Sequence, residues 1–471
     1  MSFLSEDFLL WNKGDKAIIV GVLTPSAPKT APYSIRYDTV GTATKQFLQI
    51  WDVEENLNEL ERLISTLEGK VLDRIIQKRP QIDAGTFIGK GKALEIKKRV
   101  EELGVSNVVF DENLSPSQVK NLEDIIGCRV LDRTGVILEI FHKNARTAES
   151  KTQVNIARLK YILPRLTGMW THLERQRGAG GGSAGMMGMG EKQIESDRRL
   201  IKSRISQFEK KLEQIKKDRE QQRKHREDIL KVALVGYTNA GKSSLMNLLT
   251  QSDVLAEDRL FATLDSSIRT LNPDTQPKIL LIDTVGFIKK LPPDLVASFK
   301  STLEEIKEAD MILHVVDVSH PKFKEHIQIT EKVLHELECE NKPGFLVLNK
   351  SDLMEEPLLA RISARSYKGI YENTVVTSIN DLNTIRELRE SILEFFYKNL
   401  SVWEVLVPYE DPEIAAKIHE FCHVEAKRYL EKGVFFKLKT TPHHAGRLNL
   451  NKYKLGEGFQ LDDFGGETGE E

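Results

Sequence analysis

Gly236-Tyr237-Thr238-Asn239-Ala240-Gly241-Lys242-Ser243 is a complete G-x-x-x-x-G-K-[ST] loop. The apolar run 232–235 before it predicts a buried β-strand, and the run 244–249 after it predicts the opening of a helix. In that context the glycines let backbone N–H groups turn inward around an anion, and the helix N-terminus adds partial positive charge. The sequence therefore predicts a phosphate-binding loop in a P-loop domain built on a parallel α/β sheet.

Two side chains of this loop have predicted chemical roles. Lys242 would reach the β- and γ-phosphates of a nucleotide, and the Ser243 hydroxyl would ligate Mg²⁺. The other residues expected to contact the nucleotide here are Gly236, Tyr237, Thr238, Asn239, Ala240, Gly241 and, after the loop, Ser244.

A D-x-x-G motif follows a second apolar run, residues 279–282. Asp283 stands at the end of that predicted strand, one sheet position from the loop, where its carboxylate can hold Mg²⁺ through water. The Gly286 N–H can then approach the γ-phosphate. We therefore predict that the motif, Asp283, Thr284, Val285 and Gly286, contacts the nucleotide.

An N-K-x-D motif follows a third apolar run, residues 345–348. Its Asp352 can accept hydrogen bonds from N1–H and the 2-amino group of guanine together. Adenine has an acceptor at N1 and no 2-amino group, so this aspartate selects against it. With Asn349 and Lys350, Asp352 predicts that the nucleotide is GTP or GDP and that the domain is a GTP-binding G domain.

Two further segments complete the predicted site. Phe261-Ala262-Thr263-Leu264-Asp265 lies where a first switch segment belongs, and Thr263 is the candidate that closes onto Mg²⁺ and the γ-phosphate; the alternative is an ordinary loop threonine. After the strand-like residues 375–376, Ser378-Ile379 replaces the usual Ser-Ala of the last guanine-contacting loop. The backbone N–H that contacts guanine survives this change.

The catalytic apparatus is incomplete in the sequence. Phe287 follows D-x-x-G where many GTPases have a water-orienting glutamine, and it has no hydrogen-bonding side-chain group. We predict slow intrinsic hydrolysis, with the missing groups supplied by a partner or a cation. Asn239 matches the position that supports a monovalent cation in potassium-activated GTPases with a similar loop, so we expect K⁺ stimulation. The candidate catalytic residues are Asn239, Lys242, Thr263 and Gly286.

Composition sets the broad class of the protein. With 471 residues and 40% hydrophobic content, the chain is long enough for about three domains with real cores. A net charge of −2 gives no global attraction to nucleic acid, so RNA contacts must come from local patches. Three isolated cysteines, an acidic N-terminus and no long apolar run predict a cytoplasmic protein that is neither secreted nor membrane-spanning. We also expect it to be a monomer.

The chain before the G domain has two parts. Residues up to about 145 alternate strand-like and helix-like patterns, whereas residues 149–230 are mainly helical around a glycine-rich loop at 178–190. Residues 191–231 carry fourteen Lys/Arg against nine Asp/Glu, which indicates either a solvated helix face or RNA phosphate contacts. The basic segment 89–92 is a turn into a helix or an anion or RNA contact.

Short motifs outside the phosphate loop indicate a family. They are residues 87–92 (FIGKGK), 132–134 (DRT), 145–147 (ART), 159–161 (LKY), 163–166 (LPRL), 190–199 (GEKQIESDRR), 261–265 (FATLD) and 283–288 (DTVGFI).

With these motifs, residues 15–400 resemble the HflX-type ribosome-associated GTPases. The resemblance implies GTP-dependent binding to the large ribosomal subunit and splitting of stalled or idle ribosomes. It also implies that the N-terminal region reaches toward the peptidyl-transferase centre. Family loops usually carry Arg and Pro before the closing Gly-Glu, whereas this chain has Met187 and Met189.

Beyond residue 402 the resemblance weakens. Residues 402–407 and 433–440 predict strands on either side of a helix at 412–430. That helix would carry His419-Glu420-Phe421-Cys422-His423, which matches the H-E-x-x-H zinc motif. No third ligand is convincingly placed, although His443 and His444 are downstream, so an ordinary polar helix face is the favoured interpretation.

The prediction is therefore a multidomain α/β protein. The expected parts are an N-terminal α/β domain (1–147), a helical hairpin with a glycine-rich loop (148–228), a G domain (229–400), a small α+β domain (401–455) and a disordered acidic tail (456–471). The expected function is a Mg²⁺-dependent GTPase that splits ribosomes. The alternatives are a GTPase of ribosome assembly or RNA maturation and, less favoured by the basic helices, a protein-signalling switch.

Overall fold

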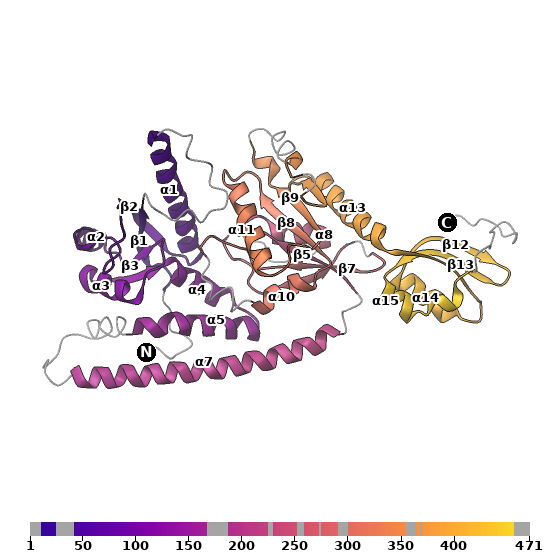
Figure 1. Cartoon of the computed structure of the whole chain (residues 1–471), viewed down its shortest axis with the longest axis horizontal. Coiled ribbons are helices and arrows are strands. Elements are labelled where there is room, and N and C mark those ends of the chain that lie inside the picture. The colour runs from indigo at the N-terminus through magenta and orange to yellow at the C-terminus, as the bar shows by residue number, and fades with distance from the viewer. Residues whose placement is uncertain are drawn as a thin grey trace. The chain divides into compact units, whose positions relative to one another are not determined.

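The structure is a computed structural model that describes most of the chain. The described residues are 11–24, 42–166, 187–224, 229–251, 259–272, 275–290, 300–354, 364–367 and 370–455. They belong to two compact units (Figure 1). Unit 1 comprises the described residues within Met1–Ile215, Asp258–Leu264 and Lys290–Phe299, and unit 2 comprises those within Lys216–Glu257, Asp265–Lys289 and Lys300–Glu471.

Unit 1 is built on a four-stranded parallel sheet with the order β2-β1-β3-β4. Its central strands are almost continuously buried, as expected for parallel strands covered on both faces. The helix that begins at Pro116 is capped by Ser115, which forms a reciprocal capping box with Gln118. The elements are β1 (Lys16–Leu23), α1 (Thr42–Thr66), β2 (Lys70–Lys78), α2 (Lys90–Leu103), β3 (Asn107–Phe110), α3 (Pro116–Ile126), β4 (Arg129–Asp132) and α4 (Arg133–Asn144).

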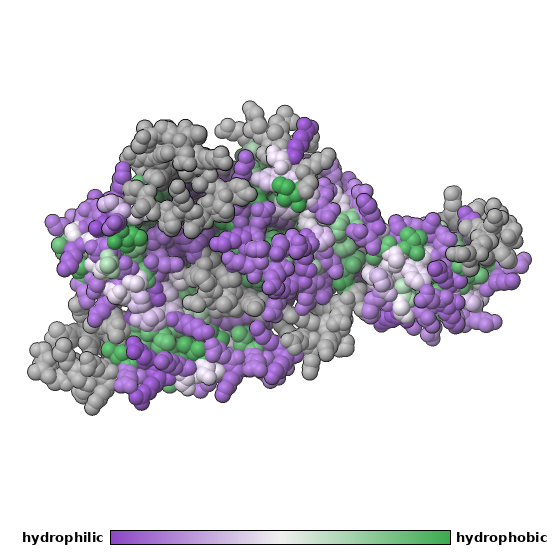
Figure 2. All heavy atoms as spheres, in the orientation of Figure 1, coloured by the Kyte–Doolittle hydropathy of each residue, from purple (hydrophilic) through white to green (hydrophobic). Residues whose placement is uncertain are grey.

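Three helical segments follow, α5 (Ala148–Ile162), the short 3-10 helix η2 (Leu163–Arg165) and the long α7 (Met187–Lys224). Figure 2 shows hydrophobic residues along the line between α5 and α7, where Ile201 and Ile205 are buried and Lys160 pairs with Glu209 at 3.0 Å. The two helices therefore share an apolar seam. The glycine-rich loop was expected to extend to Gly190, but α7 already begins at Met187, because a glycine costs a long helix only about 1 kcal/mol.

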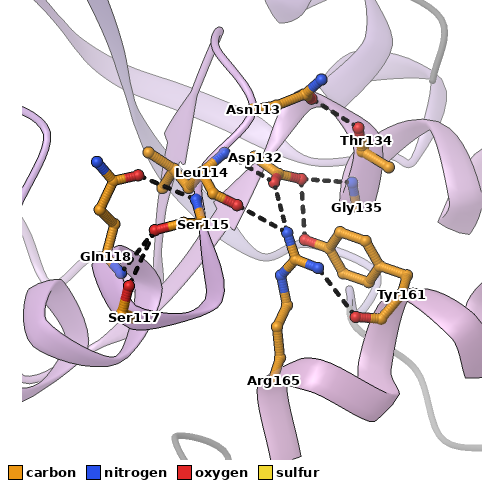
Figure 3. A network of polar contacts seen from close by, with 10 residues as sticks. All are labelled: Asn113, Leu114, Ser115, Ser117, Gln118, Asp132, Thr134, Gly135, Tyr161 and Arg165. Carbon is orange, nitrogen blue, oxygen red and sulfur yellow. Dashed lines mark hydrogen bonds and ion pairs between the residues drawn. The ribbon is translucent and has the colours of Figure 1, made fainter. Parts of the chain in front are cut away.

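A buried polar network joins the end of β4 to the end of α5 (Figure 3). Asp132 Oδ1 accepts from the Gly135 N–H at 3.0 Å and the Tyr161 hydroxyl at 2.9 Å, and its Oδ2 lies 3.1 Å from Arg165. Arg165 also donates to the carbonyl oxygens of Leu114 and Tyr161, and its guanidinium lies over the Tyr161 ring. Burial raises the pKa of Tyr161 well above its usual value, so the phenol stays neutral and donates to Asp132.

Unit 2 contains a six-stranded sheet with the order β10-β9-β8-β5-β7-β6, in which only β6 is antiparallel. This is the parallel α/β sheet that the sequence predicts, with β5 at the centre and its carboxyl end leading into the phosphate loop. The elements are β5 (Leu230–Val235), α8 (Lys242–Thr250), β6 (Ser267–Thr270), β7 (Ile279–Asp283), α10 (Lys300–Glu308), β8 (Met311–Asp317), α11 (Phe323–Glu336), β9 (Gly344–Asn349), η3 (Ser351–Leu353), β10 (Asn373–Val376) and α13 (Leu382–Asn399).

The C-terminal part differs from its prediction. The expected helix 412–430 is a helix followed by a strand, because residues 423–430 pair with the next strand from His423↔Lys439 to Leu430↔Gly433. Alternating side chains and a short turn at 431–432 favour this hairpin. The elements are β11 (Ser401–Val407), α14 (Pro412–Phe421), β12 (His423–Leu430), β13 (Gly433–Thr440), α15 (Pro442–Arg447) and η4 (Leu450–Tyr453), with the antiparallel sheet order β11-β13-β12.

This hairpin removes the zinc hypothesis. His419 lies on α14, Cys422 ends that helix in an extended conformation, and His423 starts β12. The two histidines therefore do not share one helix face, which the H-E-x-x-H geometry requires. Within the described ranges no group of three or more His, Cys, Asp or Glu side chains could hold a metal ion.

Two smaller observations concern the described residues as a whole. Cys128, Cys339 and Cys422 are buried free thiols. None of the described helices is long and apolar enough to cross a membrane. The predicted acidic tail, 456–471, and most of the glycine-rich loop lie outside the described residues.

Candidate nucleotide-binding site

The phosphate loop connects β5 to α8, as predicted, and two of its glycines are required by geometry. Gly236 has φ 150°, and a Cβ there would lie 2.1 Å from the carbonyl oxygen of Val315. Gly241 has φ 92°, and a Cβ there would lie 2.3 Å from the amide nitrogen of Asn349. Any side chain at either position would collide with the neighbouring strand ends, so the loop follows its path only with glycine.

Lys242 is the first residue of α8 and is buried against the loop. Its ammonium group donates to the carbonyl oxygens of Gly236 at 3.2 Å and Tyr237 at 3.0 Å. Burial lowers the pKa of Lys242 to about 8, and the Asp283 carboxylate opposes that shift. The Lys242 ammonium group therefore contacts the loop, and from there it can turn toward bound phosphates.

Ser243 and Asp283 come together as predicted. The Ser243 hydroxyl donates to Asp283 Oδ2 at 2.6 Å, and Asp283 is fully buried at the end of β7. The next residue, Thr284, donates through its hydroxyl to the Leu234 carbonyl oxygen at 2.7 Å, which fixes the end of β7 against β5. A hydroxyl and a carboxylate at this spacing are the hard oxygen donors that Mg²⁺ prefers.

Gly286 and Phe287 lie directly on the phosphate loop. The Thr238 N–H donates to the Phe287 carbonyl oxygen at 2.8 Å, and the Phe287 N–H donates to the Gly236 carbonyl oxygen at 3.0 Å. A Cβ on Gly286 would meet Thr238 Cα at 2.8 Å and the Lys242 ammonium at 3.0 Å. The Phe287 ring is buried in the domain.

The residues predicted to contact guanine lie together at the ends of β9 and β10. Asn349 donates through its side-chain amide to the Ala240 carbonyl oxygen at 3.0 Å, which ties this segment to the phosphate loop. Asp352 accepts from the Ser378 hydroxyl at 2.6 Å and from the Asn380 amide at 2.8 Å. The Ser378 hydrogen bond, followed by the Asn380 amide, lowers the pKa of Asp352, so it is an anionic acceptor at neutral pH.

The predicted first switch segment belongs to unit 1 as far as Leu264, and its last residue, Asp265, belongs to unit 2. Phe261 has φ 58° and is buried, its ring packs edge-on against Phe141 at 4.7 Å, and its carbonyl oxygen accepts from Asn144 at 2.7 Å. Ala262 and Thr263 are partly exposed beside it. The structure therefore brings Ser243 to Asp283 within unit 2 and assigns Thr263 to unit 1.

Two residues outside the predicted set complete the guanine end of the site. Asn380 holds one oxygen of Asp352, and Asp317 forms an ion pair with Lys350 at 2.8 Å. Asp317 ends β8 just as Asp283 ends β7, so a carboxylate after an apolar run was the signal that could have found it. Ile379, in contrast, is exposed and leaves only its backbone for a nucleotide contact.

Three family models match successive parts of the chain. Residues 54–142 match the N-terminal region of GTP-binding GTPases, and residues 144–226 match their middle region. Residues 231–350, which hold the phosphate loop and end within the N-K-x-D motif, match the model described as 50S ribosome-binding GTPase.

Curated relatives match over most of the chain. GTPase HflX of Flavobacterium psychrophilum is 44% identical, covering 73% of this chain and 86% of the relative, and GTPase HflX of Escherichia coli is 40% identical, covering 82% and 89%. A solved structure, a GTP-binding protein from the archaeon Sulfolobus solfataricus in complex with GDP, is 24% identical with a TM-score of 0.42 and covers 81% and 98% of the two chains. From the identity with its curated relatives and the assembled guanine nucleotide motifs, the chain belongs to the HflX family of GTPases and is a GTP hydrolase that binds GTP and GDP.

Proposed function

We propose that this protein binds the large ribosomal subunit in its GTP-bound form and splits stalled or idle ribosomes, and that GTP hydrolysis then releases it. The observation that carries the proposal is the match of residues 231–350 to the 50S ribosome-binding GTPases. These residues include the phosphate loop, Asp283 and Gly286. In this proposal the protein acts as a monomer on cytoplasmic ribosomes.

Nucleotide binding divides between two ends of the site. At the phosphate end, backbone N–H groups of the loop and of the first turn of α8 surround the phosphates, and Lys242 exchanges its contacts with the Gly236 and Tyr237 carbonyl oxygens for phosphate oxygens. At the base end, Asp352 accepts from guanine N1–H and the 2-amino group. Asn349 keeps both ends at a constant separation through its bond to Ala240.

Mg²⁺ would be held by the Ser243 hydroxyl and, through water, by Asp283; the oxygens of these two side chains are 2.6 Å apart. When bound, the ion supplies positive charge beside the phosphate oxygens where negative charge develops during hydrolysis. Asp283 is fully buried and its strand is anchored through Thr284, so the carboxylate keeps its place whether or not nucleotide is bound.

Hydrolysis needs groups beyond those at Gly286. The buried Phe287 ring has no hydrogen-bonding group with which to orient a water molecule, although its backbone is bonded to the loop. Asn239, with φ 60° in the loop, is the proposed ligand of a K⁺ ion that would stabilise the phosphate charge.

Turnover of the wild type and of Asn239→Ala should be compared in KCl and NaCl. Faster turnover of the wild type in KCl supports K⁺ activation, and equal rates in all four reactions refute it.

Sucrose-gradient sedimentation tests the ribosomal function. Purified intact ribosomes are incubated with the protein and a non-hydrolysable GTP analogue, and separated subunits are the expected result. Binding without splitting, or binding only to immature subunits, would instead indicate a role in ribosome assembly.

The control for this experiment is Asp352→Asn. An asparagine amide can donate to the 2-oxygen of xanthine, whereas the wild-type aspartate accepts from the 2-amino group of guanine. The variant should split ribosomes with a xanthosine triphosphate analogue and not with the guanosine analogue. Ribosome splitting by the variant with both analogues would show that splitting does not depend on base recognition at this site.

A further inference from the structure

Asp317 is the last residue of β8 and belongs to none of the nucleotide-binding motifs. In the register of the sheet it lies opposite Asn349, the last residue of β9. The Val318 N–H donates to the Asn349 carbonyl oxygen at 3.0 Å, so the two strands stay paired to their ends. The Asp317 side chain therefore lies beside the segment that carries Lys350 and Asp352.

The two oxygens of Asp317 have different partners. Oδ1 accepts from the backbone N–H of Ser319 at 3.1 Å and from its hydroxyl at 2.5 Å. Oδ2 lies 2.8 Å from the Lys350 ammonium, and both side chains of this ion pair are only 19% exposed. Because Oδ1 is bonded within its own turn, the carboxylate has a defined orientation from which Oδ2 meets Lys350.

Lys350 is held at both of its ends. Its backbone is in the left-handed region at φ 60°, between Asn349, which is bonded to the phosphate loop, and Ser351, whose N–H donates to the Thr377 carbonyl oxygen at 3.2 Å. Asp317 holds the ammonium group at the far end of the side chain. The four methylene groups of Lys350 thus span two anchored points next to Asp352.

We infer that Asp317 is a positioning residue that keeps the Lys350 stem extended beside the nucleotide base, as a preorganised surface for the purine ring. The inference rests on the proposed site, in which Asp352 binds the guanine base. A lysine side chain without this anchor samples many rotamers, and nucleotide binding must then order it. Loss of the Asp317 charge should weaken GDP binding about fivefold, the scale of a partly exposed ion pair.

The effect has a signature that distinguishes it from base recognition by Asp352. A methylene stem packs against the face of any purine. Loss of its anchor should therefore weaken the binding of guanosine diphosphate and of inosine diphosphate by the same factor. Asp352 reads the 2-amino group, which inosine lacks, so Asp352→Asn should weaken guanosine diphosphate more than inosine diphosphate.

The test is a double-mutant cycle on the dissociation constants of GDP and inosine diphosphate. Asp317→Asn keeps an oxygen for Ser319 but removes the charge that faces Lys350, and Lys350→Met keeps a stem of similar length without the ammonium. Each single variant is expected to weaken both nucleotides about fivefold, and the double variant should be no weaker than Lys350→Met alone. Unchanged or tighter binding by Asp317→Asn would overturn the inference.

Further measurements distinguish the proposed positioning of Lys350 from a purely structural role of Asp317. Asp310→Asn removes a carboxylate at the opposite end of β8, where it accepts from the Lys231 N–H at 2.8 Å, and should leave both affinities unchanged. An equal loss from Asp317→Asn in the Lys350→Met background, or a loss that follows a lowered unfolding midpoint, would make Asp317 merely structural. If Asp352→Asn does not discriminate the two nucleotides, the proposed base site itself is wrong.

Discussion

The four-stranded sheet of unit 1 and the six-stranded sheet of unit 2 use the carboxyl ends of their parallel strands in different ways. In the sheet of unit 1, Asp132 after β4 bonds to Gly135, Tyr161 and Arg165, and Asp111 after β3 pairs with the buried Arg133 at 2.8 Å. In the large sheet of unit 2, Asp283 at the end of β7 faces Ser243 and a glycine-rich loop.

The difference shows that carboxylates at strand ends do not by themselves make a ligand site. In unit 1 the same chain supplies donors for both oxygens of Asp132, so the cluster is closed and stabilises the fold (Figure 3). In unit 2 the phosphate loop has no side chains at Gly236 and Gly241, and it leads directly into the N-terminus of α8, which favours an anion. Four substitutions test this contrast.

The largest effect is expected from Gly236→Ala. The added methyl group would lie 2.1 Å from the Val315 carbonyl oxygen on a backbone with φ 150°, so the loop must move away from the phosphates. GDP affinity should fall by about a thousandfold, which is about 4 kcal/mol. Fluorescence titration with a labelled GDP measures it. Gly446→Ala, where a Cβ meets nothing within 4 Å, is the matched control and should bind normally. A loss below tenfold would contradict this account of the loop.

Asp132→Ala should have the largest effect on stability and little on binding. It leaves the Arg165 guanidinium, the Tyr161 hydroxyl and two backbone N–H groups without their carboxylate, at a cost of about 3 kcal/mol in the free energy of unfolding. Chemical denaturation of unit 1 measures this cost, with the exposed Glu102→Ala as a control on α2. A clear loss of GDP affinity at unchanged stability would show that the unit 1 cluster is a site after all.

Glu123→Gln should stabilise unit 1 at high pH. Burial raises the pKa of Glu123 from 4.5 to about 7, and one of its oxygens accepts from the Val130 N–H at 3.0 Å. Because the folded pKa is above the unfolded value, folding is favoured by protonation, and this contribution is lost as the pH rises through 7. The neutral glutamine should therefore add about 2 kcal/mol at pH 8 and nothing at pH 4. Denaturation at both pH values gives the difference, and a pH-independent effect would contradict it.

Phe287→Gln should have the smallest effect of the four substitutions, and the quantity that it tests is the rate of GTP hydrolysis. The position is buried and its backbone is bonded to Gly236 and Thr238, so a glutamine there has no access to the attacking water. The rate of single-turnover GTP hydrolysis should stay within about twofold of the wild-type rate. General acid–base catalysis requires a side chain within hydrogen-bond distance of the reacting group. Phe287→Leu serves as the apolar control. A tenfold faster Phe287→Gln variant would show that this side chain can face the phosphates.

Most of the candidate site was predictable because its signals are local. The phosphate loop, Asp283 and Asp352 each follow an apolar strand, and parallel strands bring their carboxyl ends to one edge of a sheet. Hairpin partners are not local, and residues 423–430 carried too few cues against a helix until β13 supplied the backbone bonds. Asn380 and Asp317 were missed for the same reason, because their partners lie 28 and 33 positions away in the chain.

The sequence by itself determined the nucleotide class and the central sheet, since spacing and residue type specify which atoms can meet phosphate and guanine. Only the tertiary structure decided which polar groups are already satisfied. Asp132 and Asp283 look alike in the sequence, each after an apolar run, yet one is enclosed by Tyr161 and Arg165 and the other faces the Ser243 hydroxyl. The reason is physical: a buried carboxylate needs partners, and whether they come from the chain or from a ligand depends on what the fold brings beside it.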